Sequence, residues 1–170
     1  MFQLKPISAD AIPSALVKAE RYRLLNEPVE AESICRDVLD IDHDNQPALT
    51  TLLLALTDQF GQNKGTARVE AEQLLPRLQG EYEHAYYAGI ICERWAKTQL
   101  DSGTPGHVVH DWLHVAMEWY EKAEPLAPPG NDDAILRWNA CVRLIAGNEQ
   151  IKPFDAQFSL ADDFGNDMMY

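Results

Sequence analysis

Three histidines and two acids share one segment of the chain, and their spacing suits metal chemistry. His107, His110 and His114 lie three and four residues apart. Asp111 lies between the second and third, and Glu118 follows four residues after the last. On an α-helix all five positions fall within a sector of about 100°. Since imidazole and carboxylate groups are ligands for zinc, nickel and copper, this sector is a candidate metal-binding face.

The helix that carries these residues has its apolar stripe on the other side. Ala116 and Tyr120 are at helical spacing and lie opposite the histidine sector. Polar residues on the outer face are the ordinary case for an amphipathic helix. We therefore interpret the histidine face as a solvated one and expect no cofactor. Metal binding stays as an alternative hypothesis.

Helical periodicity dominates the sequence, and no alternating strand pattern stands out. Prolines suited to a first helical turn, and Asp-, Asn- or Gly-containing turns, divide the chain into helices. Seven helices are predicted, at about 13–25, 28–41, 47–60, 67–79, 81–100, 107–124 and 133–145. For the last of these, the predicted inner face consists of Ile135, Trp138, Cys141 and Val142.

One spacing of small and apolar residues occurs twice. Ala31–Cys35–Val38–His43 recurs as Ala116–Tyr120–Ala123–Pro128, with the same intervals. This layout resembles the tetratricopeptide repeat, although that family has a proline where the first copy has a histidine. The resemblance implies an all-α fold: a right-handed α-α solenoid of about three helix hairpins plus a C-terminal capping helix, over residues 1–147.

The third hairpin is predicted to be elongated. Gly89 and Ala116 are farther apart in the sequence than the corresponding family positions, so both of its helices should be longer than usual. Gly89 belongs to a ridge of small residues that would let a neighbouring helix approach closely.

The resemblance also implies a binding surface. In the tetratricopeptide family the first helix of each hairpin lines a concave groove. Some of the matching side chains here would instead pack between repeats or contact only water. The groove positions carried over are Leu16, Glu20 and Arg23; Thr50, Leu54 and Thr57; and Tyr86, Ile90, Glu93 and Arg94.

Residues 148–170 form a predicted acidic tail that contains aromatic residues and has no helical stripe. Such a composition suits a flexible tail, a short motif that folds onto a partner, or a segment that lies in the chain's own groove. These three alternatives stay open.

Composition limits the classes of partner. The formal charge of −13 argues against nucleic acid and against anionic membranes, because both need clustered lysines and arginines. No apolar run is long enough to span a bilayer, and the N-terminus lacks the apolar core of a signal peptide. Cys35, Cys92 and Cys141 are far apart and lie in helical patterns, which favours buried thiols and a cytoplasmic location.

We expect a non-catalytic protein-interaction module, because the common enzyme motifs are absent. It would act as an adaptor, scaffold or assembly chaperone that binds a peptide or protein segment in its groove. One alternative is a metal-binding protein or metalloenzyme that uses the histidine face. Another is a helical protein that self-associates through its tail or through the elongated hairpin around Trp95, Trp112 and Trp119.

Overall fold

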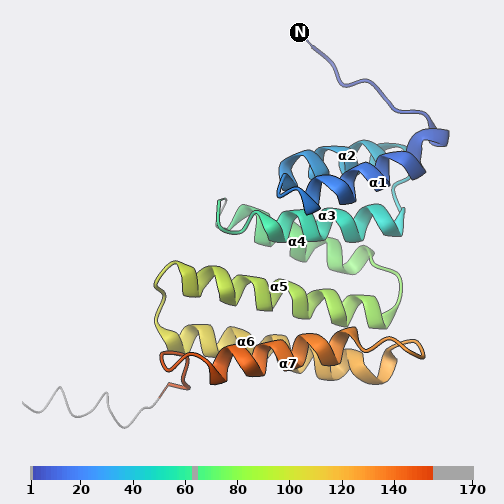
Figure 1. Ribbon diagram of the computed structural model, residues 1–170. Coiled ribbons are helices and arrows are strands. Elements are labelled where there is room, and N and C mark those ends of the chain that lie inside the picture. The colour runs from blue at the N-terminus through green and yellow to red at the C-terminus, as the bar shows by residue number, and fades with distance from the viewer. Residues whose placement is uncertain (1, 63–64, 155–170) are drawn as a thin grey trace, which may run out of the picture.

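Helices that reverse direction from one to the next are stacked from one end of the molecule to the other (Figure 1). The structure, a computed structural model, describes residues 2–62 and 65–154. Within these ranges there are seven α-helices, three short 3-10 helices and no β-strand, so the all-α prediction is confirmed. The α-helices are α1 (Ile12–Leu24), α2 (Pro28–Ile41), α3 (Gln46–Asp58), α4 (Thr66–Leu74), α5 (Glu81–Asp101), α6 (Gly106–Ala123) and α7 (Asp133–Ala146).

The helix ends follow local signals in the sequence. Pro28 is the first residue of α2, and Pro47 lies in the first turn of α3. At the start of α3 the Asn45 side chain accepts a hydrogen bond from the Ala48 N–H at 3.0 Å, which satisfies an otherwise free donor. Helix α4 ends earlier than predicted because Pro76 has no N–H to continue it, and a 3-10 turn follows at Leu75–Arg77.

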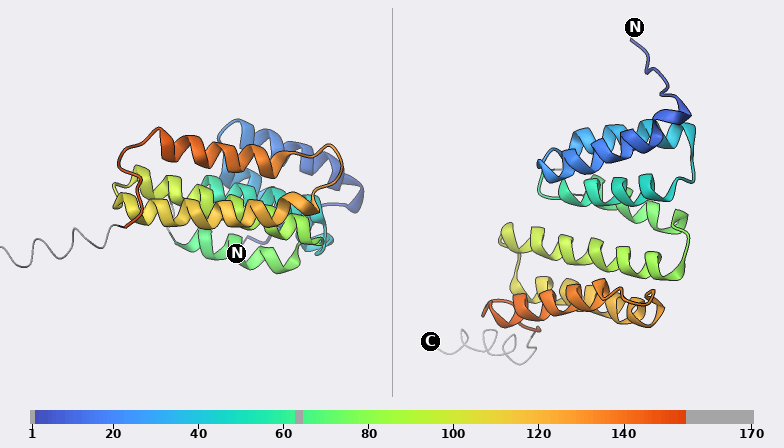
Figure 2. Two further views of the ribbon diagram at one scale, coloured as in Figure 1. Left: turned by 90° about the horizontal axis from the view of Figure 1, so that it is seen from below. Right: turned by 45° about the vertical axis from the view of Figure 1, so that its right-hand side comes forward.

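The lengths of α5 and α6 set the third hairpin apart. They contain 21 and 18 residues, whereas α1 to α4 contain 13, 14, 13 and 9. The predicted elongation of this hairpin is therefore confirmed. In both views of Figure 2 its helices extend past those of α1 to α4 at one end.

Two hydrophobic cores hold the stack together. The first lies among α1 to α4 and includes the stripe Ala31, Cys35 and Val38, each with no exposed area. The second lies among α5, α6 and α7 and includes Ala116 and Tyr120 from the second copy of the spacing. The repeated spacing thus marks one buried helix face in each core.

Helix α5 faces both cores. Ile91 packs in the first core and Ile90 in the second. The junction between the two halves is filled by aromatic contacts: Phe60 meets the edge of Trp95 with ring centroids 5.8 Å apart. The Arg68 guanidinium lies 5.2 Å from the Trp95 ring and 5.7 Å from that of Trp112. Trp119, the third tryptophan proposed for self-association, meets His84 edge to face with ring centroids 5.8 Å apart and lies under Lys122 Nζ at 4.4 Å, so all three have partners inside the molecule.

The inner face of α7 differs from the prediction. Ala134 and Cys141 are buried, whereas Ile135 and Val142 are 37% and 36% exposed. The predicted inward position of these last two was wrong because α7 ends the stack and is packed mainly against α6. A helix with one neighbouring helix buries only a narrow stripe of side chains. In α7 the small residues Ala134 and Cys141 form this stripe.

The chain continues to pack beyond the predicted boundary at residue 147. Ile151 is buried in the second core, and the Gln150 carbonyl lies against Gly106 at the start of α6. A Cβ at Gly106 would lie only 1.7 Å from that oxygen, so the close approach depends on glycine. Residues 155–170 of the predicted tail lie outside the described residues.

Gly89 gives the first test of this packing. A Cβ at residue 89 would lie 2.5 Å from the ring of Tyr120, which is itself buried. We expect Gly89→Ala to lower the free energy of unfolding by about 1–2 kcal/mol, because the overpacking outweighs the gain in helix propensity. Urea denaturation measures the difference.

The matched control is Gly61→Ala, since an added Cβ there meets nothing within 4 Å. Its free energy of unfolding should stay close to that of the parent protein. Equal stability of Gly89→Ala and the parent would contradict the close contact between α5 and Tyr120.

Candidate functional site

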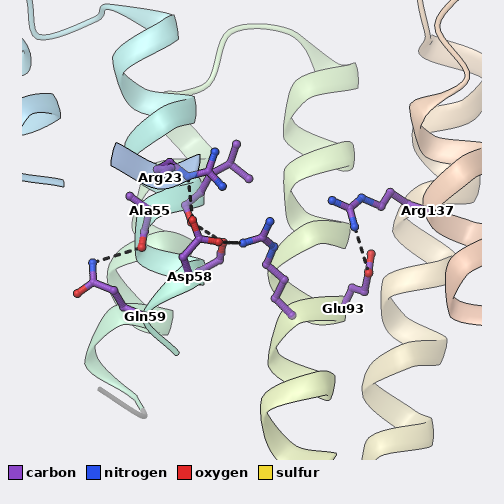
Figure 3. A network of polar contacts seen from close by, with 9 residues as sticks. Arg23, Ala55, Asp58, Gln59, Glu93 and Arg137 are labelled. Carbon is purple, nitrogen blue, oxygen red and sulfur yellow. Dashed lines mark hydrogen bonds and ion pairs between the residues drawn. The ribbon is translucent and has the colours of Figure 1, made fainter. Parts of the chain in front are cut away.

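Charged side chains form two neighbouring groups of contacts on either side of α5 (Figure 3). Asp58 at the end of α3 joins Arg23 of α1 to Arg94 of α5. Glu93, the residue before Arg94 on α5, binds Lys97 of the same helix and Arg137 of α7. Helix α3 packs against both α1 and α5, so these helices present a shared face. We call this set of residues the charged row: Arg23, Asp58, Arg94, Glu93, Lys97 and Arg137.

Asp58, the last residue of α3, binds two arginines. Its carboxylate accepts a hydrogen bond from Arg23 Nε at 2.9 Å and another from Arg94 Nη1. Arg94 Nη1 also donates to the Thr57 hydroxyl at 3.0 Å. The Asp58, Arg23 and Arg94 side chains are 22%, 20% and 24% exposed. One carboxylate therefore ties α1 and α5 to α3 while both guanidinium groups stay in contact with solvent.

Glu93 on α5 is fully buried. Its Oε2 accepts a hydrogen bond from the Tyr120 hydroxyl at 2.6 Å. Its Oε1 accepts from Lys97 Nζ at 2.5 Å and from Arg137 Nη1 at 3.4 Å. A buried carboxylate is costly unless donors surround it, and here three side chains from α5, α6 and α7 supply them.

The environment keeps Tyr120 in its neutral, donating form. Burial raises the pKa of its hydroxyl far above the ordinary value, and the neighbouring Glu93 carboxylate raises it further. The tyrosine thus donates its proton to a hydrogen bond instead of losing it. The ring occupies the space that Gly89 leaves open, so glycine, tyrosine and glutamate form one structural unit.

A tyrosine cluster adjoins Glu93 at one end. Tyr82 stacks on Tyr86 with centroids 5.6 Å apart, and Tyr86 meets the edge of Tyr87 at 5.2 Å. Burial raises the pKa of all three, while a hydrogen bond to Arg137 opposes the shift for Tyr86. All three are half-buried, so part of each remains accessible beside the charged row.

The structure brings together three of the predicted groove residues and buries others. Arg23 and Arg94 both bind Asp58, and Arg94 also donates to Thr57. Asp58 was not itself predicted, because it is not one of the positions carried over from the tetratricopeptide resemblance. Ile90, Glu93 and Thr57 are 1%, 0% and 4% exposed and so pack inside the molecule. Of the rest, Glu20 is exposed and Leu16, Thr50, Leu54 and Tyr86 are half-buried.

Lys97 and Arg137, which both contact Glu93, were also missed by sequence reasoning. Arg137 is the more distant of the two in the sequence. It reaches Glu93 from α7, forty-four positions later in the chain. Little in the sequence indicated Arg137, because aligning the last helix with the repeat pattern requires knowing which of its side chains face inward. The exposed Ile135 shows that this face was predicted in the wrong register.

The histidine face is only partly solvated. His114 and Asp111 are exposed, but the His110 side chain is 19% exposed and its Nδ1 has no hydrogen-bond partner among the described residues. His110 Nδ1 lies 3.6 Å from Asp111, and His114 Nδ1 lies 3.3 Å from Glu118. In the described part of the chain, including His107, no three histidine, cysteine or acidic side chains are grouped to hold one metal ion.

The three thiols are poor nucleophiles. Burial raises the pKa of Cys35 and Cys141 to about 12 and that of Cys92 to about 11. Since the thiolate is the reactive form, these side chains stay protonated and unreactive at neutral pH.

Cavities lie on another side, between α2 and α4. Two of them, of about 440 and 430 Å³, share a floor of Leu52 and Leu74. Arg36 crosses this space and pairs at 2.7 Å with both Glu32 and Glu70. The ion pairs of Arg36 therefore divide the space between α2 and α4.

None of the helices described combines the length and apolarity that a bilayer span requires. Comparison of the chain with protein-family models, with curated proteins and with solved structures gave no match. The likeness to tetratricopeptide repeats therefore rests on residue spacing alone.

Tyr120→Phe tests whether Glu93 depends on its donors. The substitution keeps the ring in place but leaves Glu93 Oε2 without its hydroxyl partner. We expect the free energy of unfolding to fall by roughly 1–3 kcal/mol, the cost of an unsatisfied buried acceptor. Tyr22→Phe is the control, because no bond of the Tyr22 hydroxyl is found among the described residues. If both substitutions lowered the free energy of unfolding by the same amount, the hydrogen bond from Tyr120 to Glu93 would not contribute as proposed.

Zinc titration tests the metal hypothesis. Because no three histidine, cysteine or acidic side chains of the described residues are grouped to hold one metal ion, we expect chelator-treated protein to give no saturable heat with micromolar zinc. Calorimetry of the full chain measures this, with His110→Ala/His114→Ala as control. A stoichiometric isotherm that the double substitution abolishes would establish a metal site.

Proposed function

We propose that this protein is a non-catalytic interaction module that binds a segment of another polypeptide. The binding surface is the face of α1, α3, α5 and α7 that carries the charged row and the tyrosine cluster. In this proposal the stack is a right-handed tetratricopeptide-like solenoid in the cytoplasm, and the protein acts as an adaptor, scaffold or assembly chaperone.

The observation that carries the proposal is the concentration of partly exposed tyrosine and arginine on one face. Tyrosine and arginine are enriched among the residues that dominate binding energy at protein interfaces. Here Tyr86 is hydrogen-bonded to Arg137, Tyr82 and Tyr87 pack on Tyr86, and Tyr87 lies about two helix turns before Arg94. Their positions are fixed by neighbours, so little side-chain entropy remains to be lost on binding.

This face suits binding better than the cavities between α2 and α4. The cavities between α2 and α4 are crossed by the Arg36 ion pairs, and their leucine floor is almost fully covered. No described cysteine is activated as a nucleophile, and the buried Glu93 is engaged by three donors. We therefore favour a binding role, because it needs no activated side chain beyond those described.

A pull-down comparison tests the proposal. The tagged parent protein and Tyr86→Ala/Arg94→Ala are used to capture partners from extract of the source cells, followed by mass spectrometry. We expect the double substitution to deplete at least one partner by roughly tenfold or more, because each truncation at an interface centre costs more than 1 kcal/mol.

Arg77→Ala provides the matched control, since Arg77 is exposed on the α4 side of the molecule. Thermal melting of each variant confirms that it is folded before capture. If the double variant captures the same proteins in the same amounts as Arg77→Ala, the proposed surface is not the binding surface.

A further inference from the structure

The charged row has the opposite sign from the molecule as a whole. The chain has 27 acidic residues, 14 lysines and arginines and a formal charge of −13. In the row, however, Arg23, Arg94, Lys97 and Arg137 share two carboxylates, Asp58 and Glu93. The row therefore has a local excess of two positive charges.

The internal ion pairs leave part of each cation accessible. The side chains of Lys97 and Arg137 are 44% and 34% exposed, whereas Glu93 has no exposed area. The carboxylate is thus inside the molecule and the cationic groups reach its surface. A ligand that approaches from solvent meets the lysine and the guanidinium before it meets the acid.

The arginines also keep donors for a ligand. A guanidinium has five N–H donors, two of them suited to a bidentate contact with a carboxylate. The bonds found among the described residues use Nε of Arg23 and Nη1 of Arg94. Remaining N–H groups on both side chains can therefore bind a second carboxylate without breaking the link to Asp58.

Acidic residues mark the limits of this basic strip. Glu20 lies one turn before Arg23 on α1, and Asp101 lies one turn after Lys97 on α5; both are exposed. The tyrosine cluster borders the strip near Arg137, where Glu83 and Asp133 lie close to its hydroxyls. A matching ligand has acids over the cations and an apolar or aromatic group over the tyrosines.

We propose that the segment bound at the charged row is an acidic stretch of a partner protein with at least one aromatic side chain. Its carboxylates pair with Arg23, Arg94 and Lys97, and its aromatic side chain packs on Tyr86. This inference rests on the proposed interaction role and specifies the chemistry of the partner.

Fluorescence anisotropy with the full chain tests the charge requirement. One probe is a labelled synthetic peptide rich in aspartate that also carries phenylalanine. The other is the same peptide with asparagine in place of every aspartate. We expect tighter binding of the acidic probe, a loss of that advantage at high salt, and a further weakening of roughly two- to fivefold for Arg94→Gln or Lys97→Gln.

Lys18→Gln and Arg143→Gln remove the same charge from exposed positions of α1 and α7 outside the row, and should bind the acidic probe like the parent. The inference is overturned if the asparagine probe binds equally well, if neither probe binds, or if the control variants weaken binding as much as the row variants. Partner depletion by Tyr86→Ala/Arg94→Ala would stand in all three cases, so the two proposals fail separately.

Discussion

A buried carboxylate must be surrounded by donors, and meeting this requirement for Glu93 organises the second half of the molecule. The donors come from α5 itself, from Tyr120 on α6 and from Arg137 on α7. Tyr120 reaches the carboxylate only because residue 89 has no side chain in the path of its ring. The close approach of α5 and α6 and the position of α7 are therefore coupled through one charge.

Asp58 has a related role at the junction between the two cores. It is half-buried and needs fewer donors, but those it has come from α1 and α5, on either side of its own helix. Hydrophobic contact alone tolerates sliding of one helix along another, whereas a carboxylate with two arginines specifies direction and register. The two acids together link helices that the hydrophobic cores divide into separate groups.

The sequence predicted the helices well because their signals are local. Prolines at the starts of α2 and α3 and the small-residue stripes act within a few residues, so the ends of these helices were predicted to within about two positions. The charged row was predicted only in part. Arg94 was carried over from the tetratricopeptide resemblance, but Asp58 and Arg137 depend on partners 35 to 44 positions away. Polar residues at such distances look like ordinary surface residues until the stack is formed.

The contacts between residues far apart in the sequence also explain how the charged row can bind an acidic ligand although the whole protein is acidic. The cations are already paired with Asp58 or Glu93, so folding has restricted their rotamers. At physiological ionic strength the Debye length is about 8 Å, and acids farther away than this contribute little to the local potential. A segment in contact with Arg94 and Lys97 responds mainly to these cations, whereas the approach from solution is opposed by the net charge of −13. Short-range fit, more than long-range attraction, then decides which acidic segments bind.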